Sequence, residues 1–428
     1  MIEVLELAAA SQPGVRSIIA EDGSPTYREL LAGTRPVPGR RLLELPNGAR
    51  WLSEFWSAMS GGGLVIPLNP RAKADEAGYI RTDALGADLG PGQVSVIQYT
   101  AGTSGRPKGA LLTAEGLLAV ARGHAASWRL QPGDVIFVPN PMSHIMGLVL
   151  GCLMPAVAGA TVLTMERFDP GVALDLIERH RPVAMAGTPT HYHMLAEHPD
   201  LSHRDLSSLR FGLAGGASAS PDAVRRVTDR LGLEALLNGY GMSEACGSIS
   251  RTEIGDPVEA HALTVGRPMP WLETRLREGE LSIRGEPVAR GYAGQAGLAV
   301  DPEGWFATGD LFDRDDDGRL VFKGRARDVL TVGGFNVYPA EVERVLSEHP
   351  AVAQAQVVGT PDPRLGEVPV AFVRLAAAGA ASPEDLLAFC RERLSGYKVP
   401  AALRLIDAFP VNSAGKVEKY RLREMAAR

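Results

Sequence analysis

A short loop rich in glycine and hydroxyl side chains could bind a polyphosphate. It spans residues 98–109 and reads Gln-Tyr-Thr-Ala-Gly-Thr-Ser-Gly-Arg-Pro-Lys-Gly. Glycines let backbone N–H groups turn toward an anion, because no Cβ blocks the positive φ values that this needs. Thr100, Thr103 and Ser104 add hydroxyl donors, and Lys108 adds a mobile charge. A solvated turn has the same composition, so this interpretation needs support from the rest of the chain.

The loop needs two elements to position it, a strand before it and a helix after it. We expect the strand over residues 94–99 and the start of the helix over residues 111–121. The loop is not the usual P-loop, which places Gly directly before the Lys and Ser or Thr directly after it. Here Pro107 precedes Lys108 and Gly109 follows it.

A second segment, residues 238–245, carries groups suited to a nucleotide. Tyr240 stands between two glycines and can be exposed for stacking on a base at low steric cost. Glu244 can hold Mg²⁺, which prefers oxygen ligands and phosphates. Ser243 can donate a hydrogen bond to a phosphate. Taken alone, this pattern is moderately specific.

Two further residues could complete such a site. Asp310 lies in Gly-Trp-Phe-Ala-Thr-Gly-Asp-Leu, and its carboxylate can accept hydrogen bonds from both hydroxyls of a ribose. Lys416 lies in the glycine turn Asn-Ser-Ala-Gly-Lys-Val near the C-terminus. Without other signals, a lysine in such a turn is ordinarily a solvated charge.

Composition and charge exclude several classes of protein. The chain has 428 residues, enough for two or three domains, with 45% hydrophobic and 22% charged residues, as in ordinary globular proteins. A net charge of −6 offers no basic surface for nucleic acid. The three cysteines, Cys152, Cys246 and Cys390, form no CxxC pair, which indicates a reducing compartment without a disulfide frame or zinc site. Residues 1–10 include no basic residue and do not form a signal peptide, so we expect a cytoplasmic protein.

The apolar pattern predicts an α/β fold. A helix over residues 51–59 followed by a buried strand over residues 64–68 indicates a parallel sheet flanked by helices. Residues 145–165 carry no charge and are long enough to span a bilayer, but Pro155 interrupts them. We expect a buried helix running into a buried strand there. The C-terminal part predicts a small α+β domain, with helices over 339–347 and 383–394 and strands over 353–359 and 368–375.

The segments Thr-Ser-Gly-Arg-Pro-Lys-Gly, Tyr-Gly-Met-Ser-Glu and Thr-Gly-Asp, followed by Lys416, together resemble the adenylate-forming superfamily. This superfamily includes acyl-CoA synthetases, aryl-acid ligases, peptide-synthetase adenylation domains and beetle luciferases. The resemblance runs from Thr26 to Lys416 with the main motifs in order. It implies a large domain of βα subdomains plus a β-rich part over residues 1–325, and a small mobile α+β lid over residues 326–428 with its hinge near Arg327.

The chain departs from the family pattern at three places. The segment before residue 98 is shorter than in family members, so part of an N-terminal subdomain is expected to be missing or shortened. Ser243 stands where the family usually has Thr, which keeps the hydroxyl. Arg327 stands at the hinge position, where Asp or Lys is usual.

The resemblance also implies an activity and a set of site residues. The activity is formation of an acyl-AMP from a carboxylic acid and ATP with release of pyrophosphate, then transfer of the acyl group to a thiol of coenzyme A or phosphopantetheine, with Mg²⁺ as the metal. The implied catalytic residues are Thr100, His144, Glu244 and Lys416, of which Thr100 and Glu244 would hold the metal. The implied nucleotide- and cofactor-binding residues are Thr100, Thr103, Ser104, Gly105, Lys108, Gly215, Gly216, Ala217, Asn238, Tyr240, Gly241, Met242, Ser243, Asp310, Arg325 and Gly334.

Residues 140–147 resemble the family segment that walls the acyl pocket, with His144 at its aromatic or His position. Relatives that activate amino acids carry an Asp near here, whereas this segment has no acid. A buried ammonium requires an opposite charge, so we expect a carboxylic acid without an α-amine. A pocket with Met142, Met146, His191 and Ala217 beside His144 could hold an aryl or medium acyl group.

Two alternatives stay open. The same first step could serve a different acceptor, such as a carrier protein, an amine or another nucleophile. The chain could also be a nucleotide-binding protein that no longer catalyses. The retained set of Lys108, Glu244, Asp310, Arg325 and Lys416 weighs against the second alternative. The expected partner is a small-molecule carboxylic acid, with no nucleic acid and no membrane; a carrier protein and a homodimer are left open.

Overall fold

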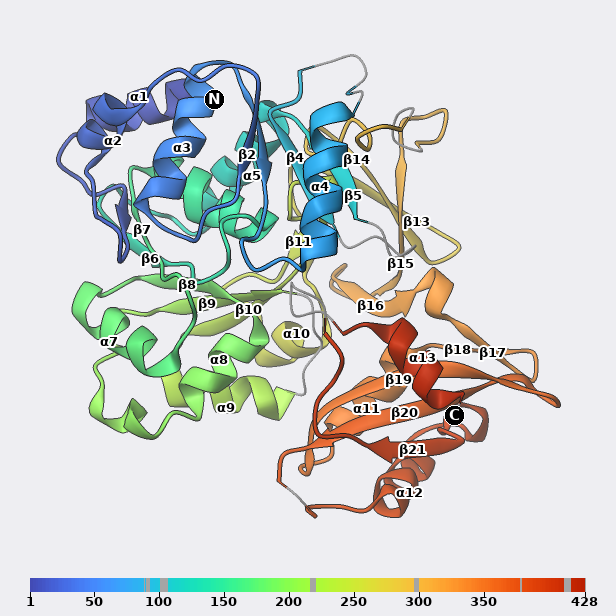
Figure 1. Cartoon of the computed structure of the whole chain (residues 1–428). Helices are drawn as coiled ribbons and strands as arrows, with labels where there is room; N and C mark the ends of the chain where they lie inside the picture. The colour runs from blue at the N-terminus through green and yellow to red at the C-terminus, as the bar shows by residue number, and fades with distance from the viewer. Residues whose placement is uncertain are drawn as a thin grey trace.

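The computed structural model describes residues 1–87, 89, 93–100, 107–215, 221–295, 300–377, 379–411 and 417–427. Figure 1 shows a large part made of the first three quarters of the chain and a separate C-terminal domain at the lower right. This division confirms the predicted fold class, a large α/β domain followed by a small α+β domain.

The centre of the large part is an eight-stranded sheet in the order β1-β7-β6-β8-β9-β10-β11-β12. The first six strands in this order are parallel: β1 (Ile18–Ile19), β7 (Thr161–Leu163), β6 (Val135–Phe137), β8 (Ala184–Gly187), β9 (Phe211–Gly215) and β10 (Ala235–Tyr240). The last two are antiparallel: β11 (Ser250–Arg251) and β12 (Arg267–Pro268).

Helices cover both faces of this sheet, so its parallel strands are buried on both sides. Ile136 and Leu237 point to one face, where they pack with α1 (Ile2–Ser11), α3 (Ala49–Ser60) and α5 (Ala114–Ser127). Their neighbours Phe137 and Leu236 point to the other face, toward α7 (Pro170–His180), α8 (Pro189–Ala196) and α9 (Pro221–Leu231). Figure 1 shows the two layers above and below the strands.

In a second sheet of the large part, two neighbouring strands flank the predicted phosphate loop. This sheet has the order β2 (Arg40–Leu43), β3 (Leu64–Pro67), β4 (Val96–Thr100), β5 (Lys108–Leu112). The prediction that a helix begins at residue 111 was wrong. Residues 108–112 pair with β4 as an antiparallel strand, and α5 begins only at Ala114, where Thr113 caps it. A short apolar run has no periodicity that separates a buried strand from a helix turn.

A third, antiparallel sheet packs against the segment that carries Glu244. It consists of β13 (Glu273–Arg277), β14 (Glu280–Arg284), β15 (Phe306–Arg314) and β16 (Leu320–Arg325). Leu281 and Phe312 of this sheet form a core with Ala245 and Ile249. This packing holds the strand bearing Asp310 beside the loop that follows β10.

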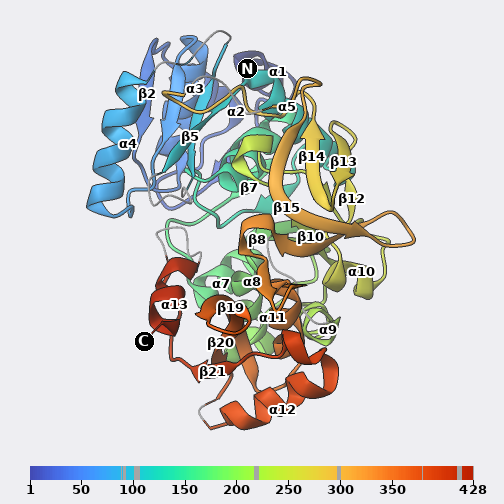
Figure 2. The ribbon, with the colours of Figure 1, turned by 90° about the vertical axis from the view of Figure 1, so that its right-hand side faces the viewer.

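The C-terminal domain has its own sheet and its own core. Its strands are β17 (Leu330–Val332), β18 (Phe335–Val337), β19 (Val352–Asp362), β20 (Gly366–Leu375) and β21 (Ala402–Leu405), and its helices are α11 (Pro339–Ser347), α12 (Pro383–Arg393) and α13 (Lys419–Ala426). Leu346, Val357 and Leu386 pack together inside it. The 3-10 helix Ala326–Asp328, where the domain boundary and hinge are predicted, joins β16 to β17. Figure 2 shows the domain below the large part from a second side.

The uncharged stretch 145–165 is a helix followed by a strand, as predicted. A π-helix over Gly147–Leu153 continues into α6 (Met154–Ala158), and β7 follows. Among the described residues, no helix has both the length and the apolar character needed to cross a bilayer. The three cysteines are buried and unpaired with one another.

Candidate active site

Three of the predicted nucleotide-binding residues are in direct contact. Tyr240 ends β10, and its hydroxyl donates to Oδ2 of Asp310 over 2.6 Å. Asp310 and Arg325 are register partners on β15 and β16, and Nε of Arg325 lies 3.4 Å from Oδ1 of Asp310. Burial, reinforced by the Asp310 charge, raises the pKa of Tyr240 well above its usual value, which keeps its hydroxyl a donor. The Tyr240 ring packs edge-on against Phe312, with ring centroids 4.8 Å apart.

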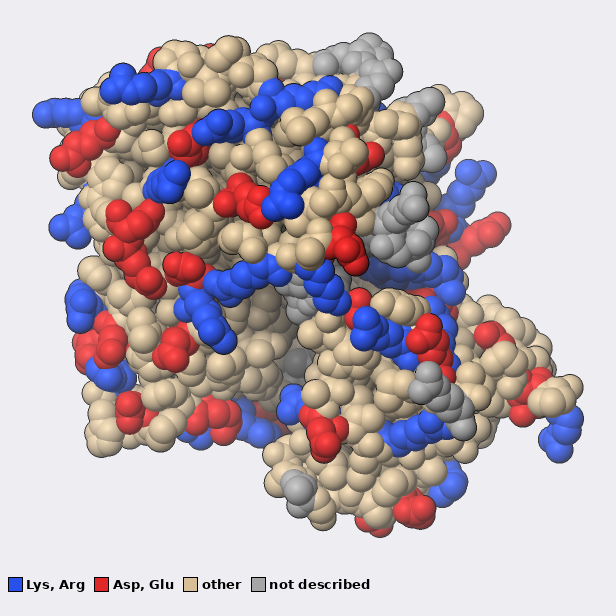
Figure 3. Space-filling model, viewed as in Figure 1, with Lys and Arg blue, Asp and Glu red and all other residues tan. Residues whose placement is uncertain are grey.

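This cluster lies where a ligand of an α/β sheet is expected. Gly215 and Tyr240 are the last residues of the parallel strands β9 and β10, and ligands of open α/β sheets bind outside the carboxyl ends of such strands. Figure 3 shows the surface hollowed between the lower part of the large domain and the C-terminal domain, with Lys and Arg side chains along the upper edge of the hollow. Positive charge at this edge suits a polyphosphate.

Glu244 belongs to a second cluster, and its partner is a residue that the sequence did not indicate. Glu244 is 8% exposed in the 3-10 helix Ser243–Ala245, and its Oε1 accepts a hydrogen bond from the Tyr292 hydroxyl over 2.8 Å. Nζ of Lys108 lies 5.2 Å from the centroid of the Tyr292 ring. Burial and then the Glu244 charge raise the pKa of Tyr292. No local pattern links position 292 to Glu244, because the two residues lie on separate segments that meet only in the folded chain, where the Ala289 N–H donates to the Glu244 carbonyl.

The residues present fit a magnesium ion bound through one carboxylate. Within the described ranges, no three His, Cys, Asp or Glu side chains gather in a way that could hold a metal ion. Mg²⁺ is typically bound by one or two carboxylates together with water and substrate phosphates, so a lone buried Glu244 beside a phosphate loop is compatible with it. The Thr100 hydroxyl, also a predicted metal ligand, donates to the Lys108 carbonyl over 3.4 Å.

The predicted wall of the acyl pocket, residues 140–147, is held from two sides by side-chain amides, one buried (Gln98) and one half-buried (Asn47). Nε2 of Gln98 donates to the Ser143 carbonyl over 2.9 Å, which ties the wall to the strand before the phosphate loop. From the other side, Asn47 accepts from the Met142 backbone N–H over 2.7 Å. His144 lies on this wall, half-buried, and its Nδ1 accepts from the Met146 N–H over 3.3 Å. The sequence did not indicate Gln98 and Asn47 as site residues either, because amides on distant segments form no recognisable spacing pattern.

Two predicted residues use their side chains for local structure. Nδ1 of His191 accepts from the Thr188 N–H over 3.2 Å as part of the cap of α8, and its ring stacks on Phe168 at 4.3 Å. Nδ2 of Asn238 donates to the Thr264 carbonyl over 2.9 Å. In this structure, His191 thus caps its own helix, and Asn238 joins β10 to the end of α10 (Val258–Leu263).

Glycines shape two of the predicted segments. A Cβ on Gly241 would stand 2.1 Å from the Gly247 carbonyl oxygen, so only glycine lets the loop carrying Met242 and Ser243 close on itself. Gly333 and Gly334 have φ values of +57° and +86° in the turn between β17 and β18. Consecutive positive φ values are typical of a type I′ hairpin turn, which favours glycine. Six predicted residues lie outside the described ranges: Thr103, Ser104, Gly105, Gly216, Ala217 and Lys416.

A buried histidine anchors the end of the Glu244 loop. His124 of α5 is 1% exposed, and its Nδ1 lies 3.3 Å from Nη1 of Arg251. Because a guanidinium can only donate, Nε2 carries the proton and donates to the Ser248 hydroxyl over 2.9 Å. Arg251 is itself buried and also bonds the Ser127 hydroxyl. This network fastens the loop to α5.

We expect His124 to make the fold less stable in acid. Burial, with the nearby Arg251 charge, lowers its pKa to about 3, against about 6.5 when unfolded. Its stabilising contribution is complete above pH ~6.5 and is lost as the pH falls toward ~3; at pH 5 the loss is about 2 kcal/mol. Urea unfolding at pH 7 and pH 5 should show a drop about 2 kcal/mol smaller in His124→Gln than in the wild type, while the exposed control His203→Gln follows the wild type. Equal drops in all three proteins would refute this role of His124.

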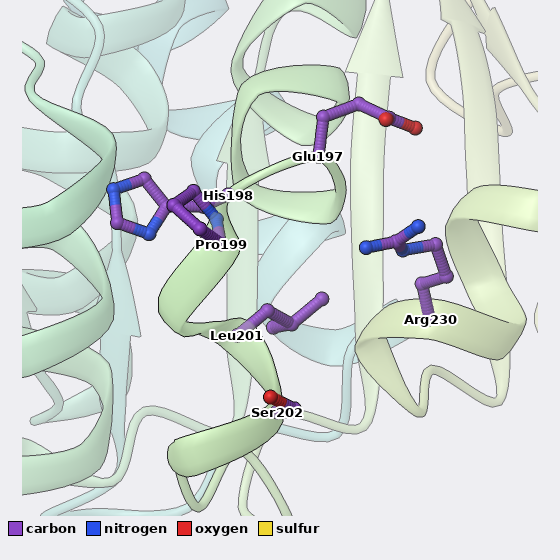
Figure 4. A pocket seen from close by; sticks show the side chains of 6 residues that line it. All are labelled: Glu197, His198, Pro199, Leu201, Ser202 and Arg230. Carbon is purple, nitrogen blue, oxygen red and sulfur yellow. The ribbon is translucent and has the colours of Figure 1, made fainter.

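A surface hollow of about 300 Å³ lies away from these clusters. It is lined by Glu197, His198, Pro199, Leu201, Ser202 and Arg230, and Figure 4 shows Glu197 and Arg230 facing each other across it. Arg230 is in the last turn of α9, whereas the first turn of α9 follows the Gly215 segment. The hollow is therefore at the far end of this helix from the candidate site.

Solved structures of adenylate-forming enzymes share this fold over nearly its whole length. The amide bond synthetase McbA from Marinactinospora thermotolerans has a TM-score of 0.85 and 28% identity, covering 99% of this chain and 100% of that one. The o-succinylbenzoate CoA synthetase MenE from Bacillus subtilis, in complex with the acyl-adenylate OSB-AMP, has a TM-score of 0.86 and 26% identity, covering 98% of this chain and 97% of that one.

The chain belongs to the AMP-binding enzyme family. The family model "AMP-binding enzyme" matches residues 84–293, and the model "AMP-binding enzyme C-terminal domain" matches residues 341–416. A 3-[(3aS,4S,7aS)-7a-methyl-1,5-dioxo-octahydro-1H-inden-4-yl]propanoyl:CoA ligase of Mycobacterium tuberculosis is 39% identical, over 80% of this chain and 68% of that protein. A feruloyl-CoA synthase of Amycolatopsis is 34% identical, over 97% of this chain and 90% of that protein.

These similarities confirm the superfamily and the class of enzyme predicted from the sequence. The protein is an AMP-forming acid–thiol ligase of the acyl-CoA synthetase type. The identity of the acid and the roles of individual side chains have to be inferred from the residues of the site.

Proposed function

We propose that this protein activates a carboxylic acid lacking an α-amine by forming an acyl-AMP from ATP, and then transfers the acyl group to coenzyme A. The observation that carries the proposal is the contact of Tyr240, Asp310 and Arg325 at the carboxyl end of the parallel sheet. It supplies a buried carboxylate for the ribose hydroxyls and a cation beside it.

Each remaining group has a proposed task in adenylation. Lys108 and the loop before it bind phosphates, and Glu244 holds Mg²⁺, whose charge offsets that of the phosphates. Lys416 bridges the substrate carboxylate and the α-phosphate and stabilises the charge that develops there. The carboxylate attacks the α-phosphorus, the bond to the β-phosphate oxygen breaks, and pyrophosphate leaves. Such phosphoryl chemistry depends mainly on positioning and charge neutralisation.

For the second step we propose a rotation of the C-terminal domain about Arg327. In the arrangement described here, Asp328 next to this hinge pairs with Arg423 of α13, with 2.8 Å between Nη2 and Oδ1. Both partners lie on the C-terminal side of Arg327, so this pair can stay intact while the domain rotates. The rotation would bring the Gly333–Gly334 turn toward the acyl-AMP to guide the thiol. Such hinge closure is common among enzymes.

The acid class follows from the pocket wall. Residues 140–147 include no Asp or Glu, so an α-ammonium group bound there would lack the opposite charge that burial demands. Met142, His144 and Met146 instead offer an apolar and partly aromatic wall. The substrate class that fits is an aryl or medium acyl acid. The unpaired cysteines support a reducing, cytoplasmic setting.

A substrate panel tests this proposal. Pyrophosphate release is measured with ATP and Mg²⁺ across aryl, fatty and α-amino acids, first without an acceptor and then with coenzyme A, a primary amine or a phosphopantetheinylated carrier protein. We expect release with one aryl or fatty class and a thioester of coenzyme A as the product. Release only with α-amino acids would overturn the acid class. An amide or a loaded carrier protein in place of acyl-CoA would overturn the proposal that coenzyme A is the acceptor. ATP binding without any release of pyrophosphate would favour a non-catalytic protein.

A further inference from the structure

The segment that carries Tyr292 joins the phosphate loop to the Glu244 loop. Its Ala289 N–H donates to the Glu244 carbonyl over 2.8 Å, and its Ala293 N–H donates to the Gly109 carbonyl over 2.8 Å. Between these points the segment exchanges two more backbone hydrogen bonds with Leu111 of β5. The backbone of residues 289–293 is therefore fixed against both neighbours.

The Tyr292 side chain also contacts residues of both neighbouring segments. Its hydroxyl donates to Oε1 of Glu244 over 2.8 Å, and its ring lies 5.2 Å from Nζ of Lys108. Glu244 is 8% exposed, and a buried carboxylate needs a hydrogen-bond donor. An ammonium within about 6 Å of a tyrosine ring is attracted to its face. One side chain thus contacts both the carboxylate proposed to hold Mg²⁺ and the lysine proposed to bind phosphates.

We infer that Tyr292 is a positioning residue that orients Glu244 for a divalent cation and holds Lys108 beside it. The inference rests on the proposed function, because it assigns Glu244 to the metal and Lys108 to the phosphates. With the hydroxyl bonded to Oε1, the carboxylate is held in one orientation, and Oε2 would be the oxygen left to bind the cation. Groups that orient a metal ligand in this way typically change metal affinity by 10- to 100-fold when they are removed.

The test compares two variants with a matched control. Tyr292→Phe removes the hydroxyl and keeps the ring, whereas Tyr292→Leu removes both. The control is Tyr27→Phe, which removes a buried hydroxyl that donates to the Ala160 carbonyl over 2.6 Å, away from the site. The readout is the Kd of Mn²⁺, measured by electron paramagnetic resonance with a non-hydrolysable ATP analogue present. The affinity for the analogue without metal is measured in parallel.

We expect Tyr292→Phe to raise the Mn²⁺ Kd about 10-fold or more while analogue binding without metal changes little. Tyr292→Leu should in addition weaken metal-free analogue binding, because Lys108 loses its ring, and Tyr27→Phe should leave the Mn²⁺ Kd unchanged. A Tyr292→Phe Kd within about twofold of the wild type would overturn the inference. If the wild type binds Mn²⁺ with the expected Tyr292 effect but releases no pyrophosphate with any acid, the inference stands and the proposed function fails. A wild type that binds no Mn²⁺ with the analogue overturns both.

Discussion

Replacing Lys416 with alanine is expected to slow acyl-AMP formation by about 10²-fold or more. The lysine is proposed to stabilise charge that develops between the carboxylate and the α-phosphate, so its loss acts on the transition state of the first step. Transfer of the acyl group from acyl-AMP to coenzyme A does not need this contact. Thiolysis of pre-formed acyl-AMP should therefore change far less.

The two steps are measured separately, by pyrophosphate release without coenzyme A and by thioester formation from synthetic acyl-AMP. Lys419→Ala is the matched control, since Lys419 is three positions further along the chain and pairs with Glu343 of α11 at 2.9 Å. It removes the same charge from the same domain and should leave the first step nearly intact. Equal losses in both steps for Lys416→Ala would contradict the role assigned to it.

The second large effect is expected at Asp310. Asp310→Asn should raise the KM for ATP on the order of 10- to 100-fold, because hydrogen bonds to a charged group contribute about 1.5–3 kcal/mol each and tenfold corresponds to about 1.4 kcal/mol. The carboxamide keeps one acceptor oxygen and turns the other into a donor, so it cannot serve Tyr240, Arg325 and the ribose hydroxyls together. The measurement is initial rates of pyrophosphate release over a range of ATP concentrations.

The same strand offers the control. Asp313 of β15 pairs with Lys323 of β16, with 3.0 Å between Nζ and Oδ2, but this ion pair is exposed. Surface pairs contribute about 0–1 kcal/mol, so Asp313→Asn should leave the KM for ATP within about twofold of the wild type. Similar KM values for the two variants would argue against a ribose-binding role for Asp310.

Elements with their own start signals could be predicted closely from the sequence. The helices at Pro339 and Pro383 begin at the predicted residues, because proline suits the first helical position, where its missing N–H is not needed. The start of the helix after the phosphate loop was wrong, because nothing local separates the buried strand Lys108–Leu112 from a helix turn. Pairing with β4, a tertiary interaction, decides that conformation.

The residues of the candidate site also fall into two groups, those that the sequence indicated and those that only the structure shows. Tyr240, Glu244 and Asp310 stand in short patterns of distinctive residue types, and these pointed to a nucleotide site before any contact was known, whereas Arg325 was indicated only by the family resemblance. Their partners depend on how strands pair and segments pack. Tyr292 reaches Glu244, and Gln98 reaches Ser143, across long sequence separations that leave no periodicity or spacing to read.

Several of the predicted functional residues, among them His191 and Asn238, have side chains whose observed hydrogen-bond partners are structural. Both are predicted site residues; in the structure the His191 side chain completes a helix cap, and the Asn238 side chain, within β10, bonds the Thr264 carbonyl. Their residue types suit either task. The hydrogen bond that each one makes depends on neighbours that the sequence alone does not position.

The account is tested most directly by following acyl-AMP through one reaction. The enzyme is mixed with ATP, Mg²⁺ and the acid that gives pyrophosphate release, quenched over time and analysed by mass spectrometry, with coenzyme A added after a delay. The account predicts that acyl-AMP accumulates in proportion to pyrophosphate before the addition, and is converted to acyl-CoA and AMP in equal amounts after it. Acyl-CoA formed with ADP and phosphate, or without any acyl-AMP beforehand, would contradict the account.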